Sequence, residues 1–207
     1  MSEPASRAEK IDRVTPELLN WHVLDDRIKT RSDAYAVVRE GRRVLIDPLP
    51  LVDEALEQLG QVEAICLTGS CHQRSAWRYR KRFGAKVHAP EGAEGLEEQP
   101  DAWYRKGERP AGDLLAIHAP GPAAAHYALL LESGGGTLFC ADILYREDGD
   151  LAFVPDQHQD DPRRTRVTAR GFLDLRFTTL CPSHGAPLTE GTHAAIRRTL
   201  EADLQRR

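Results

Sequence analysis

Short apolar segments with two different periods alternate along this chain, and their order limits the folds open to it. Residues 34–38 and 44–46 are rich in strand formers and flank the turn-forming residues 39–42, so we predict a β-hairpin there. In residues 50–59 the apolar positions have helical spacing, and a short apolar run typical of a buried strand follows at 64–67. A hairpin followed by a helix and a strand indicates a chain of the α/β class.

The rest of the chain continues this alternation and adds more strands than helices. We predict helices at residues 75–83, at about 160–175 with Pro162 in the first turn, and from Thr189 or Thr192 to the end. Residues 90–113 indicate loops, and the polar residues 1–14 indicate a flexible N-terminus. This order favours one α/β domain over residues 15–207, built as a sheet-rich sandwich. Further strands are expected at residues 86–89, 114–117, 127–131, 137–140 and 177–181.

Composition narrows the classes of partner. The chain has 207 residues, 41% hydrophobic and 29% charged, which suits one globular domain. Its formal net charge of −4 is spread along the sequence, so we expect neither a nucleic-acid nor a membrane partner. The N-terminus lacks the apolar core of a signal peptide, and no apolar run reaches the roughly 20 residues of a membrane span. We therefore expect a cytoplasmic protein with four reduced cysteines and a small-molecule partner.

Several segments, taken in order, resemble motifs of the metallo-β-lactamase superfamily. The resemblance extends from about residue 19 to about residue 204. It implies a metallo-β-lactamase-like αββα sandwich, in which two mixed β-sheets carry helices on their outer faces. The matching segments are the hairpin 34–48, the strand Ile65-Cys66-Leu67-Thr68 before the HxHxDH metal motif, the loop Ala119-Pro120-Gly121, the strand Thr137-Leu138-Phe139-Cys140-Ala141-Asp142, and Pro182-Ser183-His184-Gly185.

The same resemblance implies that the metal site is degenerate. Active members of the superfamily hold two metal ions with five histidines and two aspartates, and zinc suits such a site. On this sequence Asp142 and His184 occupy two of the seven ligand positions. The other five positions carry Gly69, Cys71, Gln73, Arg74 and Pro122.

Residues 67–74 are more similar to a divergent branch of the superfamily, in which the segment reads LTNRxHxR. They match that pattern at Leu67, Thr68, His72 and Arg74 and depart from it at residues 69–71. The stretch 151–175 is also similar to that branch. The resemblance assigns no function to it.

Asp142, His184 and His72 are our candidates for both catalysis and metal binding. The alternatives are that Asp142 caps neighbouring backbone N–H groups and that His184 orders its own turn. His72 lies one position away from the second histidine of the motif, so a metal role requires the loop to shift. The alternatives for His72 are an acid–base group in the same cleft or a surface histidine. We expect a structural role for His126.

Arg74 and Cys71 are our candidates for ligand binding. A fixed positive charge at Arg74 opposes a metal there and can either neutralise Asp142 or bind an anionic substrate. The alternative is that Arg74 faces solvent from a helix. Cys71 can serve as a soft metal ligand or as a nucleophile with His72 or His184 as base. Its alternative is a bystander role.

Three functions fit these residues. The first, which the sequence slightly favours, is a divergent hydrolase with one zinc or other divalent ion, held by Asp142, His184 and either His72 or Cys71, with water completing the shell. The second is a metal-free pseudoenzyme or small-ligand-binding module that uses the same cleft, with Arg74 as its anchor. The third is a metal-independent thiol or acid–base catalyst that uses Cys71 and His72.

Overall fold

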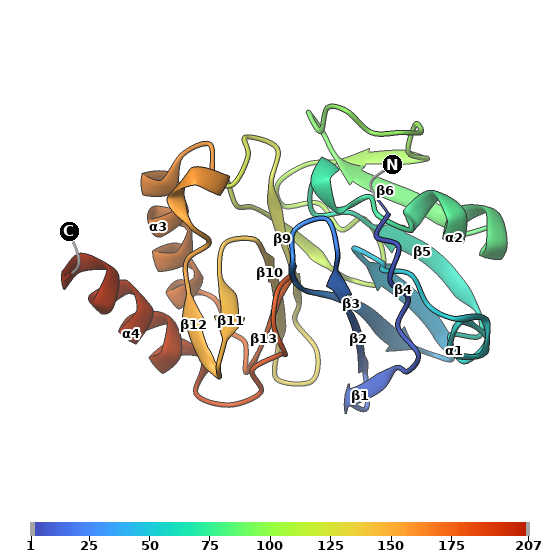
Figure 1. Ribbon diagram of the computed structural model, residues 1–207, viewed down its shortest axis with the longest axis horizontal. Coiled ribbons are helices and arrows are strands. Elements are labelled where there is room, and N and C mark those ends of the chain that lie inside the picture. Colours follow the sequence, from blue (N-terminus) through green and yellow to red (C-terminus); the bar gives the residue numbers. More distant parts are fainter. Residues whose placement is uncertain (1–2, 206–207) are drawn as a thin grey trace.

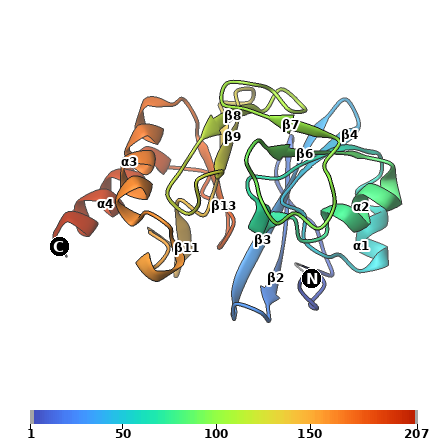
Figure 2. The same ribbon diagram turned by 90° about the horizontal axis from the view of Figure 1, so that it is seen from above.

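A computed structural model of the chain describes residues 3–205 and arranges them in four layers (Figure 1). Two β-sheets lie face to face in the middle, with α1 and α2 on one outer side and α3 and α4 on the other. Figure 2 shows the same two helix pairs on opposite sides after a 90° turn. The αββα sandwich predicted from the sequence is therefore confirmed. The helices are α1 (Asp53–Glu57), α2 (Ala76–Phe83), α3 (Pro162–Gly171) and α4 (Thr192–Gln205).

The first sheet has seven strands in the order β1-β2-β3-β4-β5-β6-β7. It is mixed, because β1 to β4 pair antiparallel and β4 to β7 pair parallel. Along β3, Ala34 and Ala36 face α1 and α2, whereas Tyr35 and Val37 face the second sheet, as the two-residue period of a strand requires. The strands are β1 (Asp12–Thr15), β2 (Leu18–Asp25), β3 (Thr30–Arg39), β4 (Arg42–Ile46), β5 (Val62–Cys66), β6 (Lys86–Pro90) and β7 (Ala102–Tyr104).

The second sheet has four strands in the order β13-β10-β9-β8 and is also mixed. In β10, Phe139 packs between the sheets, while Leu138 and Cys140 pack toward α3 and α4. A separate hairpin of β11 and β12 follows β10 in the chain. These strands are β8 (Leu115–His118), β9 (Tyr127–Leu131), β10 (Thr137–Ala141), β11 (Tyr145–Glu147), β12 (Asp150–Ala152) and β13 (Thr179–Pro182).

Two of the predicted helix boundaries have the expected physical cause. Gly84 ends α2 in a left-handed conformation, with φ of 66°, which glycine adopts at little cost. At the start of α3 the Asp161 carboxylate accepts a hydrogen bond from the Arg164 backbone N–H, and Pro162 lies in the first turn. Helix α3 is shorter than predicted, because a 3-10 turn at Phe172–Asp174 follows it.

The N-terminal segment differs from the prediction of a flexible residues 1–14. Ala8 is buried and bridges Leu51, and residues 12–15 form β1 at the edge of the first sheet. A polar segment can add to a sheet edge because backbone groups make the hydrogen bonds. Residues 1 and 2 lie outside the described part.

Three short strands also went unpredicted. Strands β7, β11 and β12 have three residues each, too few for a period to be visible, and β7 lies in the expected loop 90–113. Cys66, Cys140 and Cys181 are buried free thiols, as expected, whereas Cys71 is exposed. Within residues 3–205 no helix has both the length and the apolar character needed to span a bilayer.

Candidate functional site

The candidate residues converge where strands of the two sheets end. Strands β10 and β13 run parallel and adjacent, so their ends carry Asp142 and His184 to the same place. His72 comes from the opposite sheet, in a 3-10 turn at Ser70–His72 that follows β5. A backbone hydrogen bond of 2.8 Å from Tyr127 N–H to the Thr68 carbonyl joins the two sheets beside this turn.

In this 3-10 turn the side chain of His72 is buried, whereas Cys71 is exposed at the surface. His72 is only 2% exposed. Its Nδ1 lies 2.7 Å from Thr68 Oγ1 and 3.1 Å from Asp47 Oδ2. The Thr68 hydroxyl already donates to Asp47 at 2.6 Å, so it accepts the Nδ1–H of His72. The other ring nitrogen, Nε2, lies 3.1 Å from Asp142 Oδ2.

His184 and His126 are oriented in the same manner. Nδ1–H of His184 donates to the Arg31 carbonyl at 2.8 Å, and its Nε2 lies 3.4 Å from Asp142 Oδ1. Nδ1–H of His126 donates to the Ala119 carbonyl at 2.8 Å, and its Nε2 accepts the Asp142 backbone N–H at 3.3 Å. Three imidazoles thus present Nε2 to Asp142. Both ring nitrogens of His126 are engaged with backbone groups, which agrees with the structural role expected for it.

The carboxylate of Asp142 and the ring of His72 shift each other's protonation. Burial alone would raise the pKa of Asp142, but His72 and His184 hold it well below its usual value. Burial alone would lower the pKa of His72, but Asp142, Cys71 and Asp47 outweigh burial and raise that pKa well above its usual value. The pKa of His126 is lowered, chiefly by burial. The space between His72 and Asp142 is therefore one that favours positive charge.

The same residues offer a donor set for a metal ion. Ligand atoms of Cys71, His72 and Asp142 lie within 4.8 Å of one another. Within residues 3–205, Asp142 Oδ1 is buried, makes no hydrogen bond and faces His184 Nε2 at 3.4 Å, although the side chain as a whole is 18% exposed. A buried carboxylate oxygen without a donor is costly, and a bound cation removes that cost. A thiolate, an imidazole and a carboxylate are the ligands that zinc accepts.

Comparison with known proteins identifies the family of the chain. A family model described as the metallo-β-lactamase superfamily matches residues 11–176. The chain belongs to the metallo-β-lactamase superfamily. A search of curated proteins found no significant match.

Solved metallo-β-lactamase-fold structures share the architecture at low sequence identity. The structure of the DIM-1 metallo-β-lactamase exposed to ceftazidime matches with a TM-score of 0.76 and 11% identity, over 96% of this chain and 98% of that one. A metallo-β-lactamase from Pontibacter korlensis matches with 0.75 and 15%, over 94% and 99%. An archaeal superfamily protein from Sulfolobus tokodaii matches with 0.67 and 17%, over 84% and 80%. At these identities the likeness concerns the fold alone.

Among the replaced ligand positions of this superfamily member, Arg74 behaves differently from every expectation. It is buried, with 4% exposed, and its Nη1 donates to the backbone carbonyls of Asp33 at 3.1 Å and Asp47 at 3.4 Å. No ion pair joins it to Asp142 within residues 3–205. Arg74 has φ of 32°, and the chain changes direction there after the 3-10 turn. Its side chain contacts backbone carbonyls of β3 and of the residue after β4, and it does not extend across the site.

The side chain of Gln73 also makes its hydrogen bonds outside the site. Its Oε1 accepts from the Trp77 indole N–H at 2.8 Å and from the Glu97 backbone N–H at 2.7 Å, and its Nε2 donates to the Gly95 carbonyl at 3.2 Å. It therefore fixes the loop after β6. At Gly69 a side chain would begin 3.9 Å from both Cys71 Sγ and His126 Cδ2, so the missing histidine leaves space beside the cluster.

Two carboxylates that support the site were not among the sequence candidates. Asp47 accepts from the Thr68 backbone N–H at 2.8 Å and orients His72, and Asp33 contacts the turn that carries His184. Asp47 stood inside the matched hairpin segment and could have been found there. Asp47, Arg74 and Ala141 all have φ between 32° and 49°, a strain of about 1–3 kcal/mol each that is typical of functional sites.

Proposed function

We propose that this superfamily member is a hydrolase with one divalent metal ion, held by Cys71, His72 and Asp142, with His184 beside it. The observation that carries the proposal is that ligand atoms of Cys71, His72 and Asp142 lie within 4.8 Å of one another, at a carboxylate whose Oδ1 is buried and has no hydrogen bond within residues 3–205. Three protein ligands leave one position for water or substrate, the usual arrangement of a catalytic zinc site.

The donor chemistry favours zinc over the hard cations. Thiolate and imidazole ligands select zinc and related transition metals, whereas magnesium and calcium prefer oxygen alone. A bound ion of this kind supplies Lewis acidity and lowers the pKa of coordinated water toward 7. The chain itself orients the ligands: Thr68 and Asp47 hold Nδ1–H of His72, so that Nε2 is directed at Asp142.

The proposal is for one ion because the remaining ligand positions are committed elsewhere. The Gln73 amide is used by Trp77 and by the loop after β6. Arg74 places a fixed positive charge behind His72, and that charge opposes a second cation. The metal-free alternative used Arg74 as the anchor for a ligand, and it is less favoured because Arg74 is buried and its Nη1 donates to the backbone carbonyls of Asp33 and Asp47.

The metal content of the untagged protein tests the proposal. We expect one equivalent of metal per chain by elemental analysis after dialysis against zinc, manganese or ferrous iron. His72→Asn should lose the ion. His193→Gln, a matched control on α4 whose ring contacts the Leu175 carbonyl, should keep it. A wild-type content near zero after every loading would contradict the proposal.

A further inference from the structure

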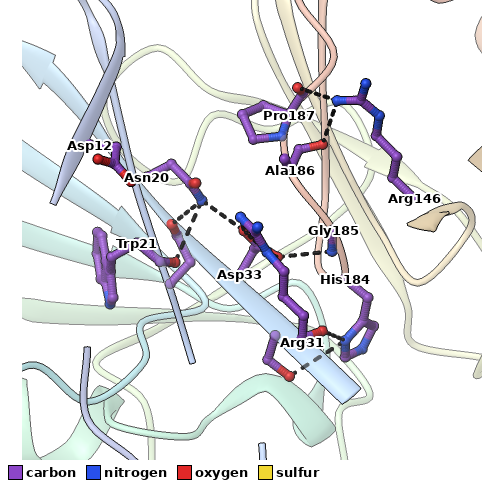
Figure 3. Close-up of polar contacts among 12 residues, drawn as sticks. Asp12, Asn20, Trp21, Arg31, Asp33, Arg146, His184, Gly185, Ala186 and Pro187 are labelled. Carbon is purple, nitrogen blue, oxygen red and sulfur yellow. Dashed lines mark hydrogen bonds and ion pairs between the residues drawn. The ribbon is translucent and has the colours of Figure 1, made fainter. Parts of the chain in front are cut away.

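A second buried carboxylate next to the site, Asp33 on β3, belongs to no proposed metal shell. Its side chain has no exposed surface. It accepts from the Arg31 guanidinium at 2.7 and 2.9 Å and from Asn20 Nδ2 at 3.2 Å. One further donor comes from a distant part of the chain, the backbone N–H of Gly185 at 2.8 Å (Figure 3).

Asp33 holds the turn after β13 with its backbone as well as with its side chain. Its N–H donates to the Ser183 carbonyl at 2.8 Å, and its own carbonyl accepts from Arg74 Nη1 at 3.1 Å. The residue therefore contacts both neighbours of His184.

The turn is confined from its other side too. Gly185 has φ of 98°, and a Cβ there would lie 2.1 Å from the Arg146 carbonyl oxygen. The Arg146 N–H donates to the His184 carbonyl at 2.8 Å. With both sides of the turn fixed, the His184 ring lies where Nδ1–H reaches the Arg31 carbonyl, and Nε2 is directed at Asp142.

We propose that Asp33 is the positioning residue for His184, acting through the backbone N–H of Gly185. Removing its negative charge loosens the turn, and the His184 ring then loses its fixed contact with the Arg31 carbonyl. The ring can next carry its proton on Nε2, which turns a donor instead of a lone pair toward Asp142. The part of this inference that concerns metal affinity rests on the proposed function, whereas the part that concerns the ring does not.

The same hairpin supplies a matched control. Asp25 on β2 is also buried, and it pairs with an arginine two residues away in the sequence, Arg27, which follows it where Arg31 precedes Asp33, at 2.6 and 2.9 Å. Within residues 3–205, the hydrogen bonds of the Asp25 side chain go to Arg27 in its own turn and do not reach residues 183–185. Asp25→Asn therefore removes a similar buried charge and leaves the His184 turn alone.

The test compares Asp33→Asn with Asp25→Asn in the full chain. Nitrogen-15 NMR of histidine-labelled, metal-free protein reports the tautomer of His184, assigned with His184→Gln. We expect the Nδ1–H tautomer in the wild type and in Asp25→Asn, and a mixture in Asp33→Asn. Titration with cobalt(II) should show up to about 10-fold weaker binding for Asp33→Asn, the lower end of the range for outer-shell partners, because His184 lies beside the proposed ligands and is not one of them.

The outcomes are separable. An unchanged tautomer in Asp33→Asn, or equal changes in both variants, overturns the inference. If the wild type binds no cobalt, the proposed function fails and the tautomer alone decides the role of Asp33. If Asp33→Asn does not fold, Arg31→Gln weakens the hold on this carboxylate and should shift the tautomer less but in the same direction. No shift in that folded variant also overturns the inference.

Discussion

The two sides of the site are built in different ways. On the side of the second sheet, Asp142 and His184 follow the adjacent parallel strands β10 and β13, and their places are set by backbone pairing and by the Gly185 turn. On the side of β5, the strand that leads to the site is present, but residues 69–74 differ from the metal motif of the superfamily. A 3-10 turn there places His72 in the site.

The side of the site that carries Asp142 and His184, here called the retained side, depends on strand pairing in the fold. The side formed by residues 69–74, here called the rebuilt side, depends on local contacts. Thr68 and Asp47 contact Nδ1 of the His72 ring. Gln73 and Arg74 make hydrogen bonds with neighbouring loops and strands. A substitution on the retained side should therefore disturb the site through its geometry. On the rebuilt side, substitutions at some residues should change metal affinity, and substitutions at others should change only stability.

The largest effect is expected at Asp142, where the two sides meet. Asp142→Asn removes the carboxylate that faces both His72 and His184. Because it is a direct ligand in the proposed shell, metal affinity should fall by more than the roughly 100-fold loss that outer-shell changes reach. Calorimetric titration with zinc measures this. Asp150→Asn on the exposed hairpin is the control, and similar affinities in the two variants would break the comparison.

The next effect concerns Cys71, the exposed ligand on the rebuilt side. Iodoacetamide should alkylate Cys71 in metal-free protein, and zinc should protect it, because a coordinated thiolate is no longer free to react. The buried Cys66, Cys140 and Cys181 are internal controls that should stay unlabelled in the folded protein. An alkylation rate that zinc does not alter would exclude Cys71 from the shell and leave its bystander role.

A smaller effect, on stability alone, is expected at Gln73. Gln73→Ala removes three hydrogen bonds, to Trp77, Gly95 and the Glu97 backbone. Leaving the indole N–H of the buried Trp77 unsatisfied should lower the free energy of unfolding by about 1–3 kcal/mol in urea denaturation, whereas the exposed Gly95 and Glu97 can bind water instead. Metal affinity should stay at the wild-type level, with exposed Gln58→Ala as the control. Loss of the metal without loss of stability would show that Gln73 still belongs to the site.

The smallest effect is a pH dependence that belongs to the scaffold. Burial lowers the pKa of His88 on β6 from 6.5. Below 6.5 the unfolded chain binds a proton that the folded chain refuses, so this contribution to stability is present above 6.5 and is lost as the pH falls through the folded pKa. His88→Gln should flatten the stability profile in this window. A steeper or unchanged profile in thermal unfolding scans would contradict the assignment.

Much of the fold could be predicted because many of its strands, helices and helix caps depend on sequence patterns of a few residues. The run of strand-forming apolar residues in β3, the helical spacing before Gly84 and the Asp161 cap each act over a few residues. Three-residue strands such as β7 could not be predicted, because they exist only through a neighbour that pairs with them.

The residues of the candidate site could be named from the sequence, but only those of the retained side could be placed in it. Asp142 and His184 follow strands that resemble family motifs, so their meeting could be expected. The inward turn of His72 and the departure of Arg74 depend on one 3-10 turn and one left-handed residue, which no period encodes. Asp33 was missed because its partner Gly185 lies 152 residues away in the chain.

Anomalous diffraction at the zinc edge, on crystals of the full chain grown with zinc, tests the central claim most directly. We predict one peak, at bonding distance from His72 Nε2, an oxygen of Asp142 and Cys71 Sγ. No peak in the site, or a second peak beside Gln73 and Arg74, would contradict the single-metal account.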